Sequence, residues 1–288
     1  MVKHPDFITA ALMEDLRGKG DITSDTLIGK RRIDAIIVAK EEGVLSGLET
    51  IDKTFERLIE IYPERYYQKP DVTVLKKNAE KVKPREVICR ITGDARIILA
   101  CERTILNILS HLSGVATLTS RFAEKVNGTR ILDTRKTTPG MREAEKKATR
   151  DGGAENHRMG LFDMMLIKDN HIKIAGGIDN ILKILENKRK SIETKVEIEV
   201  SSLDELKKVL PHRFDRIMLD NFTPRMVREA VGMRKEMGID VDFELSGGVK
   251  LDNIEEFART GIEYISVGAL THSANGLDMS LEVERVYE

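Results

Sequence analysis

Residues 196–205 read Val-Glu-Ile-Glu-Val-Ser-Ser-Leu-Asp-Glu, and this stretch contains the unit from which most of the chain is built. Its first five residues alternate aliphatic and acidic side chains, which is the period of a β-strand. Ser202 and Glu205 then have the spacing of a capping box, in which two side chains cap the first turn of a helix. The stretch therefore predicts a strand that ends in a turn and is followed directly by a helix.

The same order of a short strand and a helix recurs through the second half of the chain. Thr223-Pro224, and Asp252 with Glu255, mark two more helix starts. The expected strands cover residues 130–133, 164–167, 196–200, 217–219, 241–245 and 264–267. Repeated strand–helix units predict a parallel sheet, and without a GxGxxG fingerprint a barrel is favoured over a dinucleotide-binding fold. We expect an α/β protein with an incomplete barrel of fewer than eight regular strands.

The first third of the chain has a different pattern, in which short β-rich segments follow a helix. Apolar side chains within residues 7–16 lie on one helical face, and the helix ends at Gly18-Lys19-Gly20. Strands are expected at residues 33–39, 72–75, 86–91 and 95–99, and a helix at residues 102–126. This pattern predicts a small mixed domain ahead of the barrel.

The composition argues against several classes of protein. The 47 Lys and Arg residues balance 48 Asp and Glu residues, so no overall field attracts nucleic acid or an anionic membrane. The longest apolar runs have five residues, whereas a membrane helix needs roughly 20. The first residues do not resemble a secretory signal, so we expect a cytoplasmic protein. Cys89 and Cys101 are expected to be buried side chains rather than disulfide or zinc ligands.

Polar side chains follow the expected strands at the end where the active sites of barrels lie. Cations follow the early strands, and acids and glycine-rich turns follow the later ones. In chain order these residues are Arg135, Lys136, Lys168, Glu199, Asp220, Ser246, Gly247, Gly248 and Gly268. His157 and Arg158, in a loop bounded by glycines, add to the cations. Arginine and lysine side chains in such a cluster suit carboxylates and phosphates.

Glu197 and Glu199 share one face of the strand at residues 196–200, opposite its aliphatic face. The aliphatic face should contact the helices, so the two carboxylates should point into the barrel. Burying a carboxylate costs desolvation free energy unless a cation pairs with it. One interpretation is an internal ion pair with Lys168 or Arg135. The other is that Glu199 and Asp220 hold Mg²⁺ or stabilise a developing positive charge.

Two glycine-containing turns on consecutive late strands, at residues 246–248 and 267–269, resemble the phosphate site that barrels build there. Cations for an anionic acid, a phosphate cradle and two acids for Mg²⁺ or a cationic transition state together describe a site for phosphoribosyl transfer.

Along nearly its whole length, the sequence resembles the quinolinate phosphoribosyltransferase family. The matching strings are Glu-Asp-Leu at 14–16, Gly-Asp-Ile-Thr at 20–23, Glu-Arg-Thr-Ile-Leu-Asn at 102–107, Leu-Ser-Gly-Val-Ala-Thr at 112–117, Asp-Thr-Arg-Lys-Thr-Thr-Pro-Gly at 133–140, Asn-His-Arg-Met-Gly-Leu at 156–161, Leu-Ile-Lys-Asp-Asn-His at 166–171, Leu-Asp-Asn at 219–221 and Ser-Gly-Gly at 246–248. The strings at 133–140 and 156–161 are the most specific.

The resemblance implies an N-terminal α/β sandwich domain at residues 1–104 and a barrel-like catalytic domain at 105–272. Residues 273–288 are expected to form a helix that packs back on the N-terminal domain. The resemblance also implies a homodimer whose active sites are shared between subunits, with a higher oligomer left open.

The resemblance further implies a role for each matching residue. Quinolinate would be bound by Arg135, Lys136, His157, Arg158, Lys168 and, from the partner subunit, Arg103. The acids Glu199 and Asp220 would serve the ribose and Mg²⁺, and with Lys136 they are the expected catalytic residues. The 5-phosphate would lie at Ser246, Gly247, Gly248, Gly268 and His272.

The implied reaction joins quinolinate to phosphoribosyl pyrophosphate and yields nicotinate mononucleotide, pyrophosphate and CO₂, a step of NAD biosynthesis. One alternative is a related phosphoribosyltransferase for nicotinate, which needs the same phosphate cradle but binds a single ring carboxylate. Another is a noncatalytic relative that binds a phosphorylated ligand. Such a relative should lack Lys136, Glu199 or Asp220, and all three are present.

Overall fold

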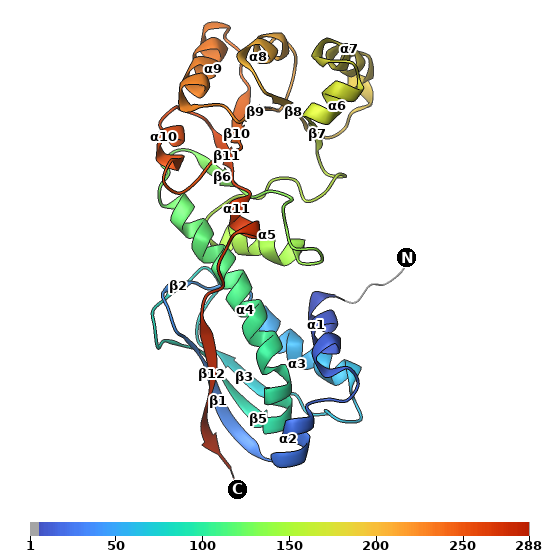
Figure 1. Cartoon of the computed structure of the whole chain (residues 1–288), viewed down its shortest axis with the longest axis vertical. Coiled ribbons are helices and arrows are strands. Elements are labelled where there is room, and N and C mark those ends of the chain that lie inside the picture. Colours follow the sequence, from blue (N-terminus) through green and yellow to red (C-terminus); the bar gives the residue numbers. More distant parts are fainter. Residues whose placement is uncertain (1–5, 288) are drawn as a thin grey trace. The chain divides into compact units, whose positions relative to one another are not determined.

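The computed structural model describes residues 6–287, which fold into two compact units (Figure 1). The N-terminal unit combines the chain up to Ser120 with residues 137–152 and the chain from Leu270 onward. The C-terminal unit consists of residues 121–136 and 153–269. The units thus interleave along the chain, whereas the expected domains are consecutive ranges. Within the described residues, no helix combines the length and the apolar character that crossing a membrane requires.

The N-terminal unit is built on an antiparallel sheet with the strand order β12-β1-β5-β3. Its strands are β1 (Arg32–Ala39), β3 (Asp71–Val74), β5 (Val87–Asp94) and β12 (Met279–Val286), and a separate pair joins β2 (Gly43–Val44) to β4 (Lys81–Val82). Its helices are α1 (Phe7–Leu16), α2 (Ile22–Leu27), α3 (Glu49–Ile61), α5 (Arg142–Asp151) and most of α4 (Ala95–Ala123).

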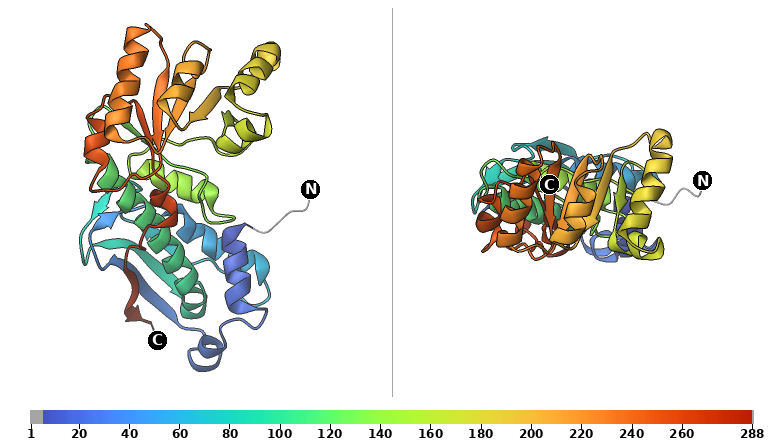
Figure 2. Two further views of the ribbon diagram at one scale, coloured as in Figure 1. Left: turned by 45° about the horizontal axis from the view of Figure 1, so that its top comes forward. Right: turned by 90° about the horizontal axis from the view of Figure 1, so that it is seen from above.

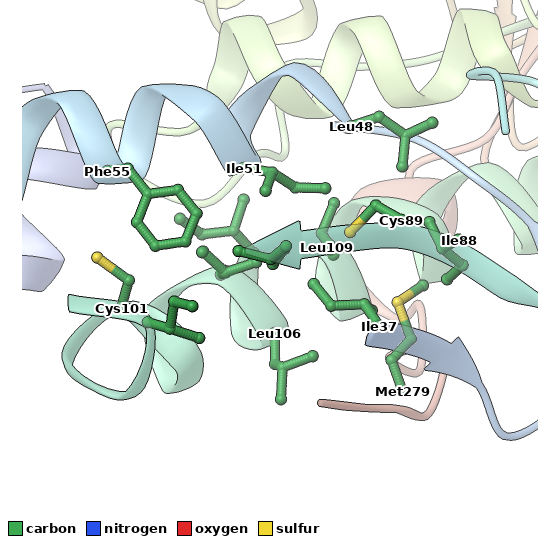
Figure 3. Close-up of a cluster of buried hydrophobic side chains, with 14 of the residues drawn as sticks. Ile37, Leu48, Ile51, Phe55, Ile88, Cys89, Cys101, Leu106, Leu109 and Met279 are labelled. Atoms are coloured by element: carbon green, nitrogen blue, oxygen red, sulfur yellow. The ribbon is translucent and has the colours of Figure 1, made fainter. Parts of the chain in front are cut away.

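Side chains from the sheet and from helices α1, α3, α4 and α5 form the core of this unit. Figure 3 shows Phe55 from α3 and Leu106 from α4 among side chains of β1, β5 and β12. Cys89 and Cys101 are fully buried free thiols in this core, as predicted. Burial raises the pKa of the Cys89 thiol to about 12. Both cysteines therefore act as small apolar side chains.

The structure corrects the helix expected within residues 273–288. Met279–Val286 form strand β12, which pairs with β1 from Ala39↔Met279 to Ile33↔Val286. From Ser280 to Val283 the sequence alternates polar and apolar side chains, which is a strand period. The segment does belong to the N-terminal unit, through this pairing and not through helix packing.

A second correction concerns the strand expected at residues 95–99. Helix α4 begins at Ala95, directly after β5, and runs without interruption to Ala123. The Asp94 carboxylate accepts the backbone N–H of Arg96 at 3.0 Å and pairs with its guanidinium, so it caps the helix start. The β-branched pair Ile97-Ile98 is therefore helical, because the cap and the buried helix face outweigh its strand propensity.

The C-terminal unit contains a six-stranded parallel sheet with the order β6-β11-β10-β9-β8-β7. The strands are β6 (Arg130–Leu132), β7 (Met165–Ile167), β8 (Val196–Val200), β9 (Arg216–Asp220), β10 (Asp242–Ser246) and β11 (Tyr264–Ser266). Each lies within two residues of its expected range. Among the described residues the sheet has two edges, β6 and β7, so it is the expected incomplete barrel.

Helices follow most of these strands and cover one side of the sheet (Figure 2). They are α6 (Asp169–Ile174), α7 (Ile178–Lys188), α8 (Leu203–Val209), α9 (Pro224–Glu236) and α10 (Ile254–Ala258); the short helices η1 (Arg189–Ser191) and α11 (Ala269–His272) complete the chain. Two of the three expected caps are present, at Ser202, which accepts the Glu205 N–H, and at Thr223, which accepts the Met226 N–H. The third expectation, at Asp252, is wrong, because α10 begins at Ile254 and its N-cap residue, Asn253, makes no side-chain capping hydrogen bond. All five residues of β8 are buried, so its acidic side chains lie inside the unit.

Candidate active site

The strand register brings the carboxyl ends of the parallel strands to one edge of the C-terminal sheet. Ser246 at the end of β10 pairs with Asp220 on β9 and with Ser266 on β11, and Ser266 in turn pairs with Leu132 on β6. The loops that carry the predicted site residues begin at these positions, where α/β barrels bind their ligands.

Lys168 and Glu199 form the central ion pair of this edge. The Lys168 Nζ lies 2.6 Å from Glu199 Oε2, and Lys168 is the residue that precedes helix α6. The side chain of Glu199 is 9% exposed, whereas that of Lys168 is 44% exposed. The ion pair expected from the alternation of β8 is therefore present, with Lys168 as the cation.

Asp220 adds a second carboxylate beside this pair. Burial raises the pKa of Asp220 above its usual range, and the negative charge of Glu199 adds to the effect. The Lys168 charge and a hydrogen bond from Asn221 Nδ2, at 2.9 Å, work in the opposite direction without overcoming it. Glu199 and Asp220 thus place two carboxyl groups close together at this edge, beside the Lys168 side chain.

Two arginines concentrate positive charge near the end of β6. Burial lowers the pKa of the Arg158 guanidinium, and the positive charge of Arg135 lowers it further. Arg158 Nη1 donates a hydrogen bond to the carbonyl of Met164 at 3.1 Å, which orients the side chain. A second guanidinium so close to Arg158 makes this a site suited to an anionic ligand.

The loop at residues 156–158 is held by Asp133, the fully buried residue that follows β6. Its carboxylate accepts a hydrogen bond from the His157 backbone N–H at 2.9 Å and another from Asn156 Nδ2. One buried carboxylate therefore fixes the start of the loop that carries His157 and Arg158.

The His157 ring is directed toward two buried glutamates. Its Nε2 lies 3.4 Å from Glu197 Oε2 on β8 and 3.4 Å from Glu244 Oε2 on β10. Burial lowers the pKa of His157, but the hydrogen bonding and charges of Glu197 and Glu244 outweigh it and raise the pKa to about 9. At the other ring nitrogen, Nδ1 accepts the Arg158 backbone N–H at 2.7 Å, which favours the neutral ring. Both states place a proton on Nε2, toward the carboxylates.

The turn after β10 has a backbone that glycine alone accommodates well. Gly247 has φ +90°, and a Cβ there would collide with Asn221 Oδ1. Asn221, also in a left-handed conformation with φ +56°, donates its backbone N–H to the Ser246 carbonyl at 2.8 Å. The Ser246-Gly247-Gly248 turn is thereby fixed against the end of β9.

The predicted site residues divide between the two units. The C-terminal unit holds Arg135, Lys136, His157, Arg158, Lys168, Glu199, Asp220, Ser246, Gly247, Gly248 and Gly268. Arg135 and Lys136 are exposed, in the turn after β6. Arg103, exposed on α4, and His272, exposed at the end of α11, belong to the N-terminal unit.

Sequence reasoning gave no role to Asp133, Arg216 or Glu244. Each has a signal that could have been read: Asp133 follows a strand directly, and Glu244 is acidic within the apolar strand 241–245. Arg216 precedes the expected strand 217–219, so it was left outside the sheet. The ion pair of Arg216 and Glu244 joins two strands and becomes visible only with the strand order.

Comparisons with known proteins place the chain in one family. Residues 21–113 match the N-terminal domain of quinolinate phosphoribosyl transferase, and residues 115–282 match its C-terminal domain. An Arabidopsis thaliana protein named nicotinate-nucleotide pyrophosphorylase (carboxylating) is 36% identical over 306 residues, covering 98% of this chain and 84% of that protein. A Nicotiana tabacum protein named quinolinate phosphoribosyltransferase (decarboxylating) 2b is 35% identical, covering 95% of this chain and 80% of that protein.

Solved structures give the same result. The nicotinate-nucleotide pyrophosphorylase of Francisella tularensis superposes with a TM-score of 0.85 at 37% identity, covering 98% of both chains. Both domain models of one family match in order and leave little of the chain unmatched. The chain belongs to the quinolinate phosphoribosyltransferase family.

Proposed function

We propose that this chain transfers the phosphoribosyl group of phosphoribosyl pyrophosphate to quinolinate and releases pyrophosphate and CO₂, with nicotinate mononucleotide as product. The observation that carries the proposal is the 2.6 Å ion pair of Lys168 and Glu199 beside Asp220, at the sheet edge where Arg135 and Arg158 also lie close enough to repel each other. A dianionic ring acid would relieve the repulsion between the arginines, and a sugar that develops positive charge would suit the two acids.

Quinolinate would bind at the cationic end of the site. Arg135 and Arg158 offer guanidinium groups to its carboxylates, and Lys136, Lys168 and His157 surround them. Arg103 is exposed on α4, in the other compact unit, which supports a contribution from the partner subunit of a homodimer. We propose that the active form is such a dimer, which could assemble further.

The acids would serve the ribose and Mg²⁺. Glu199 and Asp220 fit this ion, because burial and then the charge of Glu199 raise the pKa of Asp220, and a bound cation would favour its ionised form. Mg²⁺ is commonly held by one or two carboxylates together with substrate phosphate oxygens. When bound, the ion would neutralise charge on the departing pyrophosphate.

The 5-phosphate would lie at the late turns. The left-handed glycines Gly247 and Gly248, with Ser246, expose backbone at the end of β10, and Gly268 follows β11. His272 supplies a ring nearby in sequence, at the end of α11.

The reaction would proceed in two steps, substitution at the anomeric carbon and then decarboxylation. The quinolinate nitrogen attacks the anomeric carbon, a C–N bond forms, and the C–O bond to pyrophosphate breaks. The 2-carboxylate then leaves as CO₂, its electron pair stays on the ring carbon beside the cationic nitrogen, and a proton replaces it. Glu199 and Asp220 would stabilise positive charge at the sugar, while the arginines and lysines hold and orient the carboxylates.

Product formation with each acid tests this proposal. The chain is incubated with phosphoribosyl pyrophosphate, Mg²⁺ and either quinolinate or nicotinate, and CO₂ and mononucleotide are measured together. We expect equal amounts of both from quinolinate and none from nicotinate. Turnover of nicotinate without CO₂ would make nicotinate the substrate instead of quinolinate, and no product from either acid would favour a noncatalytic relative.

We also propose that the protein works in the cytoplasm. The buried free thiols of Cys89 and Cys101 support a reducing compartment.

A further inference from the structure

A buried cluster of charged side chains lies on the inner face of the C-terminal sheet, beneath the loop that carries His157 and Arg158. Its members are Glu197 on β8, Arg216 on β9, Glu244 on β10 and the His157 ring. Both glutamate side chains are fully buried, and the His157 side chain is 6% exposed. Burying charged side chains costs desolvation free energy, so such a cluster is expected to have a structural or functional role.

One carboxylate of the cluster already has a cation. Arg216 Nη1 lies 2.7 Å from Glu244 Oε2, and the guanidinium stacks on the Tyr264 ring at 3.8 Å from its centroid. The contact with the His157 ring and the charge of Arg216 lower the pKa of Glu244 against the effect of burial. The Arg216 guanidinium thus holds the Glu244 carboxylate from β9.

Glu197 lacks an equally close partner. Burial and the neighbouring charge of Glu244 raise its pKa. Within residues 6–287, neither of its oxygens receives a hydrogen bond of regular geometry, and its closest ion contact is His157 Nε2 at 3.4 Å. His157 Nε2 lies 3.4 Å from one oxygen of each carboxylate, so two glutamates on different strands contact the same ring nitrogen, although neither contact has the geometry of a regular hydrogen bond.

The opposite edge of the same ring contacts the backbone of the substrate loop. His157 Nδ1 accepts the Arg158 N–H at 2.7 Å, and the His157 N–H donates to Asp133 at 2.9 Å. The ring thus connects the carboxylates to the residue whose guanidinium lies near Arg135.

We propose that Glu197 and Glu244 are positioning residues for quinolinate: they fix the His157 ring through Nε2 and, through the ring, the backbone of Arg158. They act without touching the substrate. The inference rests on the proposed function for the ligand that Arg158 binds, but the ring contact itself does not depend on it.

A divalent cation could also be held by His157 Nε2, Glu197 and Glu244, whose ligand atoms all lie within 4.8 Å of one another. That arrangement requires a lone pair on Nε2. The positioning role proposed for the two glutamates requires a proton on Nε2. Metal binding and the positioning role therefore predict opposite protonation states of His157 Nε2.

The first test reads that state in the unmodified protein. Long-range ¹H–¹⁵N spectra of protein labelled in its histidine rings are recorded, with His157→Gln assigning the signal. We expect a protonated Nε2 at pH 7.5 that does not respond to added Zn²⁺. An unprotonated Nε2, or one whose signal shifts with Zn²⁺, would overturn the proposal.

The second test measures kinetics of Glu197→Gln and Glu244→Gln, which keep side-chain size and remove the charge. A Gln amide can donate to Nε2, which would move the ring proton to Nδ1 and disrupt the Arg158 hydrogen bond. We expect the KM for quinolinate to rise roughly 10- to 100-fold, the effect of losing one charged hydrogen bond, with the KM for phosphoribosyl pyrophosphate within about twofold.

The matched control is Glu263→Gln. Glu263 also lies in the C-terminal unit and pairs with an arginine, Arg234, at 2.7 Å, but it lies at the amino end of β11. We expect unchanged KM values for this variant. Unchanged quinolinate KM in folded Glu197→Gln and Glu244→Gln would overturn the proposal, and the spectra of the unmodified protein decide it if these variants do not fold. If the unmodified chain does not turn over quinolinate, the proposed function fails, and the spectra still report on the ring contact.

Discussion

Lys168 and Glu199 form a 2.6 Å ion pair that joins the start of helix α6 to strand β8, at the edge of the sheet where the substrate is proposed to react. The glutamate is buried and the lysine partly exposed, so the two side chains differ in how easily water can solvate their charges. Removing the lysine leaves a buried carboxylate without its closest cation, whereas removing both charges leaves none to compensate.

This difference in burial predicts the result of a double-mutant cycle. We expect Lys168→Met to lower the free energy of unfolding by about 1–2 kcal/mol. Adding Glu199→Gln should recover most of that loss, while both the single and the double variant lose activity. Urea unfolding and turnover, measured side by side, check this. A double variant no more stable than Lys168→Met would contradict it.

The raised pKa of Asp220 predicts a gain in stability from a variant that destroys activity. A carboxyl group whose pKa is raised on folding binds its proton more tightly in the folded state. Its contribution is favourable at low pH and is lost as pH rises through the raised pKa. At neutral pH the ionised group is therefore a cost, and Asp220→Asn should unfold at an equal or higher temperature than the unmodified chain.

Thermal unfolding at pH 4 and pH 7 measures this effect. The difference in Tm between Asp220→Asn and the unmodified chain should be more positive at pH 7. Asp240→Asn, in an exposed position before β10, is the matched control and should change little at either pH. If the Tm difference between Asp220→Asn and the unmodified chain is more negative at pH 7 than at pH 4, the predicted direction of the effect is wrong.

Arg135 is predicted to act in quinolinate binding. Arg135→Ala should raise the KM for quinolinate and lower kcat/KM by about 1.5–3 kcal/mol, the range for a hydrogen bond to a charged group. Steady-state kinetics with quinolinate varied check this, with phosphoribosyl pyrophosphate varied as the internal comparison. Unchanged kinetics would remove Arg135 from the site.

Gly247 is predicted to be intolerant of a side chain. Gly247→Ala combines a left-handed backbone with a collision at Asn221, so we expect a loss of about 1–3 kcal/mol of stability and a raised KM for phosphoribosyl pyrophosphate. Gly261→Ala shares the left-handed backbone, with φ +83°, but its Cβ would meet open space. Equal losses in the two variants would show that backbone strain alone, rather than the turn against Asn221, sets the effect.

Much of the C-terminal unit could be predicted from the sequence, because each strand there carries its own signal. Alternating residues in β8 and capped helix starts at Ser202 and Thr223 are local features, and they locate the elements within about two residues. The Lys168–Glu199 pair was one of two open interpretations, since both residues belong to strand ends.

The remaining features depend on partners far away in the chain. Strand β12 needs β1, and the contact of His157 with Glu197 and Glu244 needs the order of three strands. No window of sequence contains both members of such pairs, so local patterns could not locate them.

The pairing of β1 with β12 has a consequence for how the protein is made. Lys40, just after β1, meets Glu282 on β12, 242 residues further along the chain. During synthesis β1 emerges before β5 and can pair with it early, but the other edge of β1 stays open until β12 has been made. At about 5–20 residues per second that interval lasts many seconds, during which an unpaired strand edge can contact other nascent chains. Completion of this sheet therefore waits for the synthesis of the C-terminal unit that lies between β5 and β12 in the chain.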